Sequence, residues 1–386
     1  MLDKKIECYH RGEIFLTYKT GIVGTGAIGW RIIKEMDEHK DYEVAGFAKT
    51  STGGRFKDLI SKYPFYVSKN VNMEKYSLDD MYIRLKSKKA DFSKHNPSGH
   101  LLDLLLKVDV IFDATPGKMG IKNKILYEHK ILNQKREEIG LKPLKVIYQG
   151  GESPEVAESS FIANPCYHKV SNESLNQRVV SCNTTGMGRP LYSLLQNKEI
   201  PEIDRAYNTL VRRSIDPSSK KGSFIDAFKA EANSHHGHDL NTIYPNLKIG
   251  TTAFAVPMSH FHGHSLTVLF KDNIESEDVE ELLRKDPRIA VINPPGLFSG
   301  DLFEISRQFW NQDSFVVAAQ VKKMSDFDDS LEILLAVPQE SIVIPESIDC
   351  VNALLTNKSK KQSMDTTNDL LEIPEIKQQL EYELTP

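Results

Sequence analysis

Short apolar runs alternate with amphipathic stretches along the first part of the chain, and this alternation predicts a parallel sheet flanked by helices. Residues 27–40 predict a helix, because apolar side chains recur there at helical spacing at Ile28, Ile32, Ile33 and Met36. The predicted strands cover 19–23, 42–48, 108–113 and 145–148. Strand, crossover helix and strand in this order form right-handed parallel units. The first part of the chain is therefore predicted to be of the α/β class.

The pattern changes around residue 182, where the predicted strands lie further apart and several alternate between apolar and polar positions. These strands cover 205–213, 247–256, 266–270, 315–321 and 331–337, with a helix at 276–285. Longer, mixed strands with helices between them indicate an α+β domain. A helix is predicted after Pro345, and the residues from about 357 are read as a helix or a loose tail. The polar, Lys-rich stretch 62–107 is predicted to be partly a surface insertion.

Composition narrows the functional classes. The chain has 386 residues and a formal net charge of 49 − 53 = −4, so we expect no nucleic-acid partner, which would need a clustered positive surface. No apolar run is long enough to span a membrane and no leader peptide is visible. The four cysteines lie far apart without a CxxC pair, which disfavours a disulfide scaffold or a zinc finger. We expect a cytoplasmic globular protein without a membrane partner.

A glycine-rich turn, GTGAIG at 24–29, joins the first predicted strand to the first predicted helix. Gly24 permits the tight turn, Gly26 lets a pyrophosphate approach the backbone, and Gly29 lets helix and strand pack closely. The helix N-terminus supplies a positive partial charge for the phosphates. The motif predicts a Rossmann dinucleotide-binding domain over residues 1–181, with a catalytic α+β domain over 182–344. Residues 345–386 would be a returning helix with a tail.

The end of the second strand bears on the choice of dinucleotide. A carboxylate that binds the ribose 2′-hydroxyl of NAD is expected there. The sequence instead has Lys49 and Thr50, and a cation beside hydroxyls suits the 2′-phosphate of NADP. We predict NADP or NAD as the cofactor; an ordinary solvated lysine is the other interpretation.

The segment SCNTTG at 181–186 predicts a reactive thiol, because Cys182 follows a strand and precedes a helix that runs through 195. A thiol at a helix N-terminus is expected to lose its proton more easily. Asn183 and neighbouring amides could hold an oxyanion. The other interpretation is a buried structural cysteine, and we read Cys8, Cys166 and Cys350 in that way.

Two histidine clusters could supply a base for this thiol, HHGH at 235–238 and HFHGH at 260–264. In an extended segment His260, His262 and His264 all point the same way, so one of them could face Cys182. Three imidazoles at this spacing could instead chelate zinc, although no further ligand lies near in sequence. We predict no metal. Arg212 and Arg213 end a strand, and one of them could bind a phosphate.

Six segments in one order carry a family resemblance: DATP at 113–116, YQGGE at 148–152, SCNTTG at 181–186, VRRSIDP at 211–217, SHHGHD at 234–239 and VPQE at 337–340. Over roughly residues 20–355 the chain resembles the archaeal-type (type II) glyceraldehyde-3-phosphate dehydrogenases. The resemblance implies a homotetrameric enzyme with a Rossmann domain and a catalytic α+β domain. It also implies the substrates glyceraldehyde 3-phosphate and inorganic phosphate and a nicotinamide cofactor.

The same resemblance implies roles for individual residues. Cys182 matches the nucleophile and His262 the base, and we expect Arg212 to anchor phosphate. The implied substrate-contacting residues are Ser181, Asn183, His235 and His236. The implied cofactor-contacting residues are Ala27, Ile28, Gly151, Arg213 and Gln339, with Lys49 and Thr50 near the adenosine phosphate. The chain departs from the family in its leading twenty residues, its longer 62–107 stretch, His238 in place of proline, and a tail after 370.

These observations predict phosphorylating oxidation of glyceraldehyde 3-phosphate to 1,3-bisphosphoglycerate through a cysteine thioester. One alternative is another acyl-enzyme semialdehyde dehydrogenase, whose substrate lacks the terminal phosphate. A second alternative is a non-catalytic dinucleotide-binding regulator, which would be expected to have lost the thiol and the base.

Overall fold

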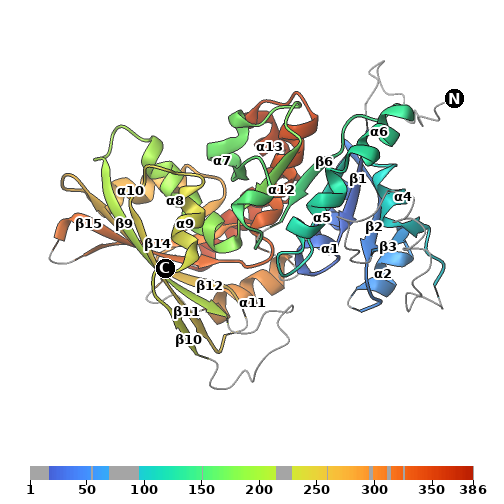
Figure 1. Ribbon diagram of the computed structural model, residues 1–386. Helices are drawn as coiled ribbons and strands as arrows, with labels where there is room; N and C mark the ends of the chain where they lie inside the picture. The colour runs from blue at the N-terminus through green and yellow to red at the C-terminus, as the bar shows by residue number, and fades with distance from the viewer. Residues whose placement is uncertain are drawn as a thin grey trace, which may run out of the picture.

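The computed structural model describes residues 17–53, 55–68, 95–149, 151–213, 228–258, 260–294, 299–310, 314–324 and 327–385. Two sheets lie side by side, and the C-terminal helices return beside α7 between them (Figure 1). Within the described residues, the first sheet has eight strands and the second has seven. This arrangement confirms the predicted fold class, a parallel α/β unit joined to a mixed α+β unit.

The first sheet is parallel throughout and follows the order β4-β3-β2-β1-β5-β6-β8-β7. Its strands are β1 (Tyr18–Val23), β2 (Tyr42–Lys49), β3 (Phe65–Val67), β4 (Gly99–His100), β5 (Val110–Asp113), β6 (Lys145–Tyr148), β7 (Ser160–Phe161) and β8 (Asn176–Val179). The chain order reverses between β1 and β5, the point at which dinucleotides bind in such sheets. All loops that follow the strands therefore open on one edge.

Helices cover both faces of this sheet, as a parallel sheet requires. One face packs against α1 (Ala27–Glu38), α2 (Phe56–Ile60) and α12 (Val343–Leu355), and alternate strand residues such as Ile22 and Phe47 point into that core. The other face, with Val23 and Ala48, packs against α4 (Leu101–Leu105), α5 (Gly120–Tyr127) and α6 (Lys130–Glu138). Short connecting helices are η2 (Pro154–Val156), α7 (Ala163–Cys166) and η3 (Tyr167–Lys169).

The second sheet is mixed, in the order β10-β11-β9-β12-β15-β14-β13. Its strands are β9 (Ile203–Arg213), β10 (Lys229–Glu231), β11 (Ile249–Val256), β12 (His262–Phe270), β13 (Ile289–Val291), β14 (Val317–Met324) and β15 (Phe327–Val337). Among the described residues, α8 (Cys182–Gln196), α9 (His235–Asn241) and α10 (Ser276–Arg284) pack against one face of this sheet, and the C-terminal helix described below covers one edge. The strand residues on the side of these helices, including Leu210, Leu266 and Ile333, are buried.

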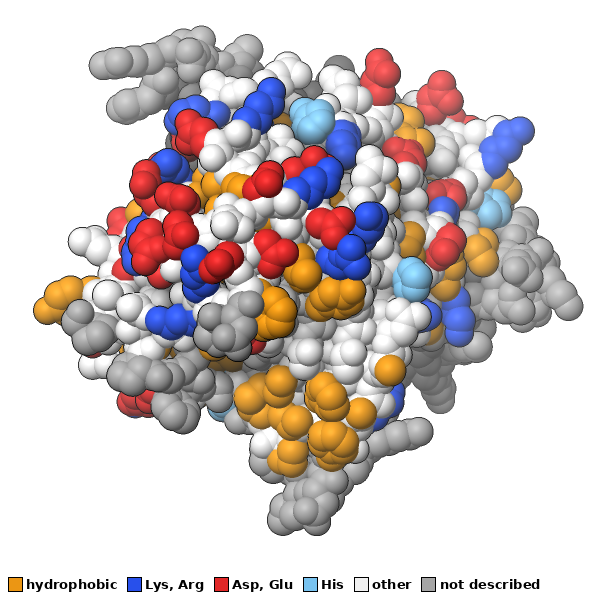
Figure 2. All heavy atoms as spheres, turned by 90° about the vertical axis from the view of Figure 1, so that its left-hand side faces the viewer, with side chains coloured by type: hydrophobic (Ala, Val, Ile, Leu, Met, Phe, Trp, Pro, Cys, Tyr) orange, Lys and Arg blue, Asp and Glu red, His pale blue; other side chains and the backbone are white. Residues whose placement is uncertain are grey.

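The opposite face of the second sheet is open over β9, where Arg205, Tyr207 and Thr209 are exposed. Tyr207 is 52% exposed, and Phe228, which stacks on Phe254, is 66% exposed. Figure 2 shows apolar side chains gathered low on the molecule, at the height of β10 and β11 in Figure 1. An aromatic surface of this kind is unusual on an isolated monomer.

The predicted surface insertion at 62–107 is wrong at both ends. Residues 65–67 and 99–100 are strands of the first sheet, and α4 buries Leu101, Leu102, Leu104 and Leu105 against it. The lysines that precede the leucines of α4 led the whole stretch to be interpreted as surface, although the leucines are buried. Residues 69–94 lie outside the described residues.

The C-terminal residues form helices α13 (Lys360–Leu370) and α14 (Ile373–Glu383), so the alternative of a loose tail is wrong. A buried cluster of charges ties α13 to the rest of the molecule, because hydroxyls of α13 donate to the carboxylate of Asp349 in this cluster. Arg288 lies 2.5 Å from Asp349 of α12 and 3.3 Å from Glu346, which also lies 2.9 Å from Arg189 of α8. Burial alone would raise the pKa of Glu346, but the two guanidinium groups hold it below its usual value.

Helix α14 covers the outer edge of β13, the last strand of the second sheet. The backbone N–H of Val291 donates to the carboxylate of Glu381 at 2.9 Å, and that of Asn293 donates to the carbonyl of Leu384 at 3.1 Å. An uncovered edge strand would present these amides to other chains. Within the described residues, no helix is long and apolar enough to cross a membrane.

The charge cluster predicts a large stability effect for Asp349→Asn. The substitution leaves the buried guanidinium of Arg288 without its 2.5 Å carboxylate partner. Breaking one partner of a buried pair costs about 3–5 kcal/mol. We expect a lower midpoint of thermal unfolding by calorimetry, and an unchanged midpoint would contradict this account of the cluster.

Candidate active site

The chain passes from the first sheet to the second between β8 and α8, and Cys182 is the first residue of α8. Ser181 is the N-cap of the helix, and its hydroxyl accepts the backbone N–H of Thr184 at 3.3 Å. Two residues, Val180 and Ser181, are all that separate strand from helix. The position of the thiol is therefore fixed by both sheets.

The thiol of Cys182 is half-buried, and burial raises its pKa to about 11. The guanidinium of Arg212 and the backbone N–H of Asn183 pull the pKa downward, and Glu340 pushes it upward. The expectation of an easily lost proton is wrong for this state of the protein. The helix terminus does favour the thiolate, but removal from water outweighs it because the site is enclosed by β9, β12 and α9.

Two histidines of β12 point toward α8 from one face of the strand. His262 is 2% exposed and His264 is 3% exposed, and both belong to the buried positions of the strand. The Nδ1 of His262 accepts the backbone N–H of Arg213 at 3.3 Å, so the neutral ring carries its proton on Nε2. Burial lowers the pKa of His262 well below its usual value, and nearby cations add to the effect.

His264 holds the side chain of Asn183. Its Nε2 lies 3.0 Å from Oδ1 of Asn183, and its Nδ1 lies 3.3 Å from Nδ2 of Asn208. An amide oxygen only accepts, so Nε2 of His264 donates, and the NH₂ group of Asn183 is turned away from His264. Burial lowers the pKa of His264 to about 3.

The expectation that His260 points with His262 and His264 is wrong. Phe261 has a φ of 58°, a left-handed conformation that breaks the alternation of the strand. β12 begins only at His262, and His260 lies against Phe303 of α11 (Ser299–Trp310) with ring centroids 3.7 Å apart. No sequence signal predicts a positive φ at a phenylalanine.

Neighbouring arginines of β9 have different surroundings. Arg212 lies on the side of the histidines, where its charge lowers the pKa of Cys182, His236, His262 and His264. Its buried Nε has no hydrogen-bond partner among the described residues. Arg213 instead pairs with Glu340, the residue after Gln339.

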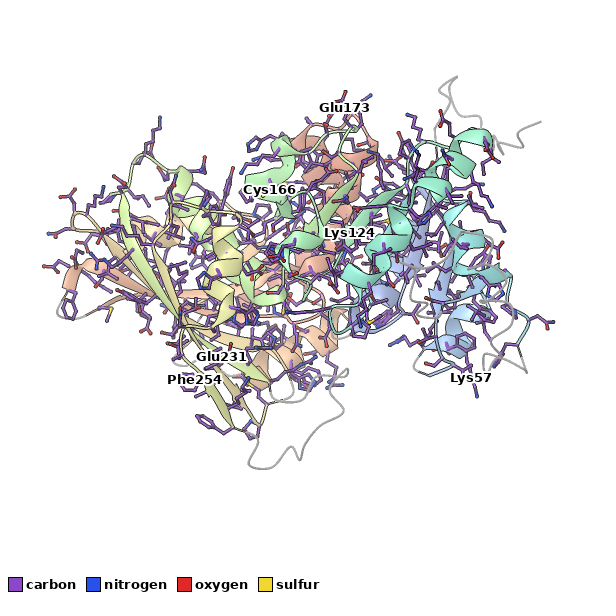
Figure 3. The ribbon with its side chains drawn as sticks, in the orientation of Figure 1. Lys57, Lys124, Cys166, Glu173, Glu231 and Phe254 are labelled. Atoms are coloured by element: carbon purple, nitrogen blue, oxygen red, sulfur yellow. The ribbon has the colours of Figure 1, made fainter. Side chains whose placement is uncertain are left out.

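The two histidines of α9, His235 and His236, differ in exposure although their rings stack with centroids 4.1 Å apart. His236 is buried, its Nδ1 lies 3.1 Å from the hydroxyl of Ser234, and burial lowers its pKa to about 2. His235 is exposed and lies 3.8 Å from Glu231. Glu231 is at the end of β10 and is labelled in Figure 3. The structure thus brings Cys182, Asn183, Arg212, His236, His262 and His264 to one site.

The glycine loop at 24–29 has the space that a dinucleotide needs. A Cβ on Gly29 would lie 2.0 Å from the carbonyl oxygen of Gly24, so helix and strand pack closely there. A Cβ on Gly26 would meet nothing within 4 Å, and α1 begins at Ala27 with no side-chain cap on its free amides. These residues fit a bound pyrophosphate. Ile28 follows in the first turn of α1.

Lys49 and Thr50 at the end of β2 were predicted from the sequence, but Arg31 and Arg55 were missed. The ammonium of Lys49 donates to the carbonyl of Gly53, and Thr50 is exposed. The guanidinium carbons of Arg55 and Arg31 lie 3.9 and 4.5 Å from the ring centre of Trp30 in α1. The sequence does show Arg31 directly after Trp30 and Arg55 directly after the glycine pair at 53–54. That both arginines stack on Trp30 depends on tertiary contact and could not be predicted.

Two further predicted cofactor residues lie in loops. Gly151 has a φ of 98° in the loop after β6, a conformation that favours glycine. Gln339 follows β15, and its buried Oε1 has no hydrogen-bond partner among the described residues.

The remaining cysteines and the metal interpretation can be placed as well. Cys166 of α7 (Figure 3) and Cys350 of α12 are buried in the core, and Cys8 lies outside the described residues. In the part of the chain that the structure describes, no group of three or more His, Cys, Asp or Glu side chains could hold a metal ion.

Comparison with known proteins gives a consistent result. Residues 181–308 match the family model of the glyceraldehyde 3-phosphate dehydrogenase C-terminal domain. The chain is 33% identical over 364 residues to glyceraldehyde-3-phosphate dehydrogenase of Archaeoglobus fulgidus, covering 93% of this chain and 98% of the relative. It is 34% identical over 362 residues to the protein of that name from Thermococcus kodakarensis, covering 92% and 98%.

The raised pKa of Cys182 predicts slow alkylation that accelerates with pH. At pH 7 a thiol of pKa about 11 is ionised in about one molecule in ten thousand, and this fraction grows about tenfold per pH unit. We expect the rate of carboxamidomethylation of Cys182 by iodoacetamide, followed by mass spectrometry, to rise accordingly from pH 7 to 9. Arg212→Met removes a cation that lowers this pKa, so its rate at each pH should be lower. A rate independent of pH would show that the thiol is already ionised.

Proposed function

Because the chain belongs to the archaeal-type glyceraldehyde-3-phosphate dehydrogenases, we propose that Cys182 is the nucleophile with which this NAD(P)-dependent enzyme oxidises and phosphorylates glyceraldehyde 3-phosphate. The observation that carries the assignment is the position of Cys182 at the start of α8, between Arg212 and the amide of Asn183. The product of the family reaction is 1,3-bisphosphoglycerate.

The proposed reaction begins when the thiolate of Cys182 attacks the aldehyde carbon and a C–S bond forms. The NH₂ group of Asn183, turned away from His264, would donate to the developing oxyanion. The bound nicotinamide cofactor supplies the hydride acceptor. Inorganic phosphate then attacks the thioester carbon, the C–S bond breaks, and the acyl phosphate leaves Cys182 free.

We assign proton transfer at the hemithioacetal oxygen to His262, whose neutral state follows from its lowered pKa. The hydrogen bond from the Arg213 amide to Nδ1 of His262 keeps the ring proton on Nε2, so His262 must change tautomer before Nε2 can act as a base. For Nε2 to take up a proton, the ring must move its own proton to Nδ1, and the contact with Arg213 must then open. His262 would consequently hold the proton only briefly in each turnover.

Phosphate binding is proposed for Arg212 together with His235 and His236 of α9, with Ser181 contacting the substrate. The buried Nε of Arg212 has no hydrogen-bond partner among the described residues, and its guanidinium could pair with phosphate oxygens. A second anion in the same site would be needed when inorganic phosphate enters. The exposed ring of His235 lies at the rim of the site and could contact it first.

Cofactor binding is proposed at the α1 N-terminus, with Gly24, Gly26, Ala27, Ile28 and Gly29 holding the pyrophosphate. Gly151, Arg213 and Gln339 would contact the cofactor nearer the thiol. The unpaired Oε1 of Gln339 could accept from an amide N–H of the cofactor.

We propose that NADP binds at least as tightly as NAD, since Lys49, Thr50 and Arg55 lie after β2, where the adenosine ribose sits in this fold. Arg55 is held on the ring of Trp30 and could pair with a 2′-phosphate from there.

Self-association, as a homotetramer, is also part of the proposal. The open face of the second sheet, with Tyr207 and Phe228, offers an aromatic surface for a second copy. A cytoplasmic location is proposed from the glycolytic reaction of the family.

The first functional prediction is an assay with a matched variant. The purified protein should reduce NADP or NAD when given glyceraldehyde 3-phosphate and inorganic phosphate together. Cys182→Ser should lower turnover by several orders of magnitude, because a serine hydroxyl has no appreciable anionic fraction at neutral pH. Its cofactor dissociation constant should hardly change. Retention of a tenth of the activity would overturn the assignment of the nucleophile.

Cofactor choice gives a further prediction. A charge-assisted contact is worth about 1.5–3 kcal/mol, so Lys49→Ala should weaken NADP binding by roughly one to two decades. NAD binding should be nearly unchanged, because NAD lacks the 2′-phosphate. Both dissociation constants can be measured by calorimetry. Equal losses for the two cofactors would mean that Lys49 makes no contact specific to the 2′-phosphate.

A further inference from the structure

The side chain of Arg178 links the first sheet to α9, the helix that packs against the second sheet. Arg178 belongs to β8 and is only 1% exposed. Its Nε and Nη2 donate to the hydroxyl of Ser160, Nη1 donates to the carbonyl of Glu152, and Nη2 also reaches the hydroxyl of Thr242. Nη1 also lies 2.6 Å from a carboxylate oxygen of Asp239, with which the guanidinium forms a buried ion pair.

Asp239 belongs to α9, the helix that carries the two histidines proposed to bind phosphate. It lies three residues after His236, so the two share one side of the helix. One carboxylate oxygen faces Arg178, and the other accepts the hydroxyl of Thr184 at 2.6 Å. Both oxygens of this nearly buried carboxylate therefore bind elements other than α9.

The hydroxyl of Thr184 passes this constraint to the first turn of α8. Because its hydrogen is donated to Asp239, its oxygen accepts from the hydroxyl of Ser181 at 2.9 Å. Ser181 in turn accepts the backbone N–H of Thr184. The hydroxyl of Ser181, next to Cys182, is consequently fixed with its hydrogen directed inward. It can offer a substrate only a lone pair, which suits a hydroxyl group rather than an oxyanion.

We propose that the chain Arg178–Asp239–Thr184–Ser181 sets the position of α9 relative to the start of α8. Arg178 and Asp239 act as positioning residues: they touch no reacting atom and fix the separation between the phosphate-binding histidines and the thiol. Reacting groups misplaced by about 1 Å can cost about a hundredfold in rate. The inference rests on the proposed function of Cys182 and α9.

The test compares a variant that lacks the hydroxyl of residue 184 with one that keeps it. Thr184→Val keeps the shape and loses the hydroxyl, and Thr184→Ser keeps the hydroxyl. We expect kcat/KM for glyceraldehyde 3-phosphate to fall at least fivefold in Thr184→Val and to stay within twofold in Thr184→Ser. Asp239→Asn should lose at least 30-fold with the cofactor dissociation constant unchanged. Thr184→Val should then add no more than a twofold loss in the Asp239→Asn background.

Asp349→Asn is the matched control, because it also breaks a buried arginine–aspartate pair, while Asp349 itself contacts Arg288 and α13 and touches neither the first turn of α8 nor α9. It should lower the unfolding midpoint while leaving kcat/KM within twofold. If the factor by which Asp239→Asn lowers kcat/KM is no more than three times the factor for Asp349→Asn, the proposal is overturned. The proposal is also overturned if the loss of kcat/KM in the double variant equals the product of the losses in Thr184→Val and Asp239→Asn, since independent sites behave in that way.

Alkylation of Cys182 separates this proposal from the proposed function. Burial is the largest cause of the high pKa of Cys182, so loosening the start of α8 should admit water and speed carboxamidomethylation at pH 8. We expect at least a threefold increase in Asp239→Asn and none in Asp349→Asn. If the wild-type protein does not oxidise glyceraldehyde 3-phosphate, the proposed function fails. An unchanged alkylation rate in Asp239→Asn overturns the positioning proposal by itself.

Discussion

Two residues join the last long strand of the parallel sheet to the helix that underlies the mixed sheet, and the site depends on this short connection. The loops after β1, β6 and β8 open on the same edge, because all strands of that sheet run in parallel. The glycine loop, Gly151 and Ser181 therefore lie along one edge of the sheet. Since α8 starts at Cys182, the same turn brings Asn183 within hydrogen-bond distance of His264 in β12.

Desolvation and positive charge together decide the resting state of the site. Burial keeps the thiol protonated, and burial beside Arg212 keeps His236, His262 and His264 neutral. Within this group, Arg212 supplies the positive charge. A phosphorylated substrate would bring the negative charge that the site lacks. The same anion would make a protonated histidine less costly, so that substrate binding prepares the proton transfer.

Local signals made the outline of the site predictable. The glycine loop needs particular backbone angles, and Cys182 was placed between a strand and a helix from the residues on either side of it, so both could be read from neighbouring residues. Features set by distant contacts could not. The direction of the Cys182 pKa depends on what encloses the thiol, the turn at Phe261 moved His260 away from its neighbours, and Arg55 meets Trp30 only in the folded chain. The link from Arg178 to Asp239 joins residues 61 positions apart (239 − 178) and has no signature in either segment.

The cover that α14 gives β13 has a consequence for synthesis of the protein. Val291 is translated 90 residues before Glu381, the side chain that accepts its amide. At about 5–20 residues per second, the ribosome needs roughly 5 to 18 s to make that stretch. Once β14 has been made and has paired with β13, the outer edge of β13 is open to pairing with other strands for the rest of this interval. Helix α14 ends this exposure when it packs against β13.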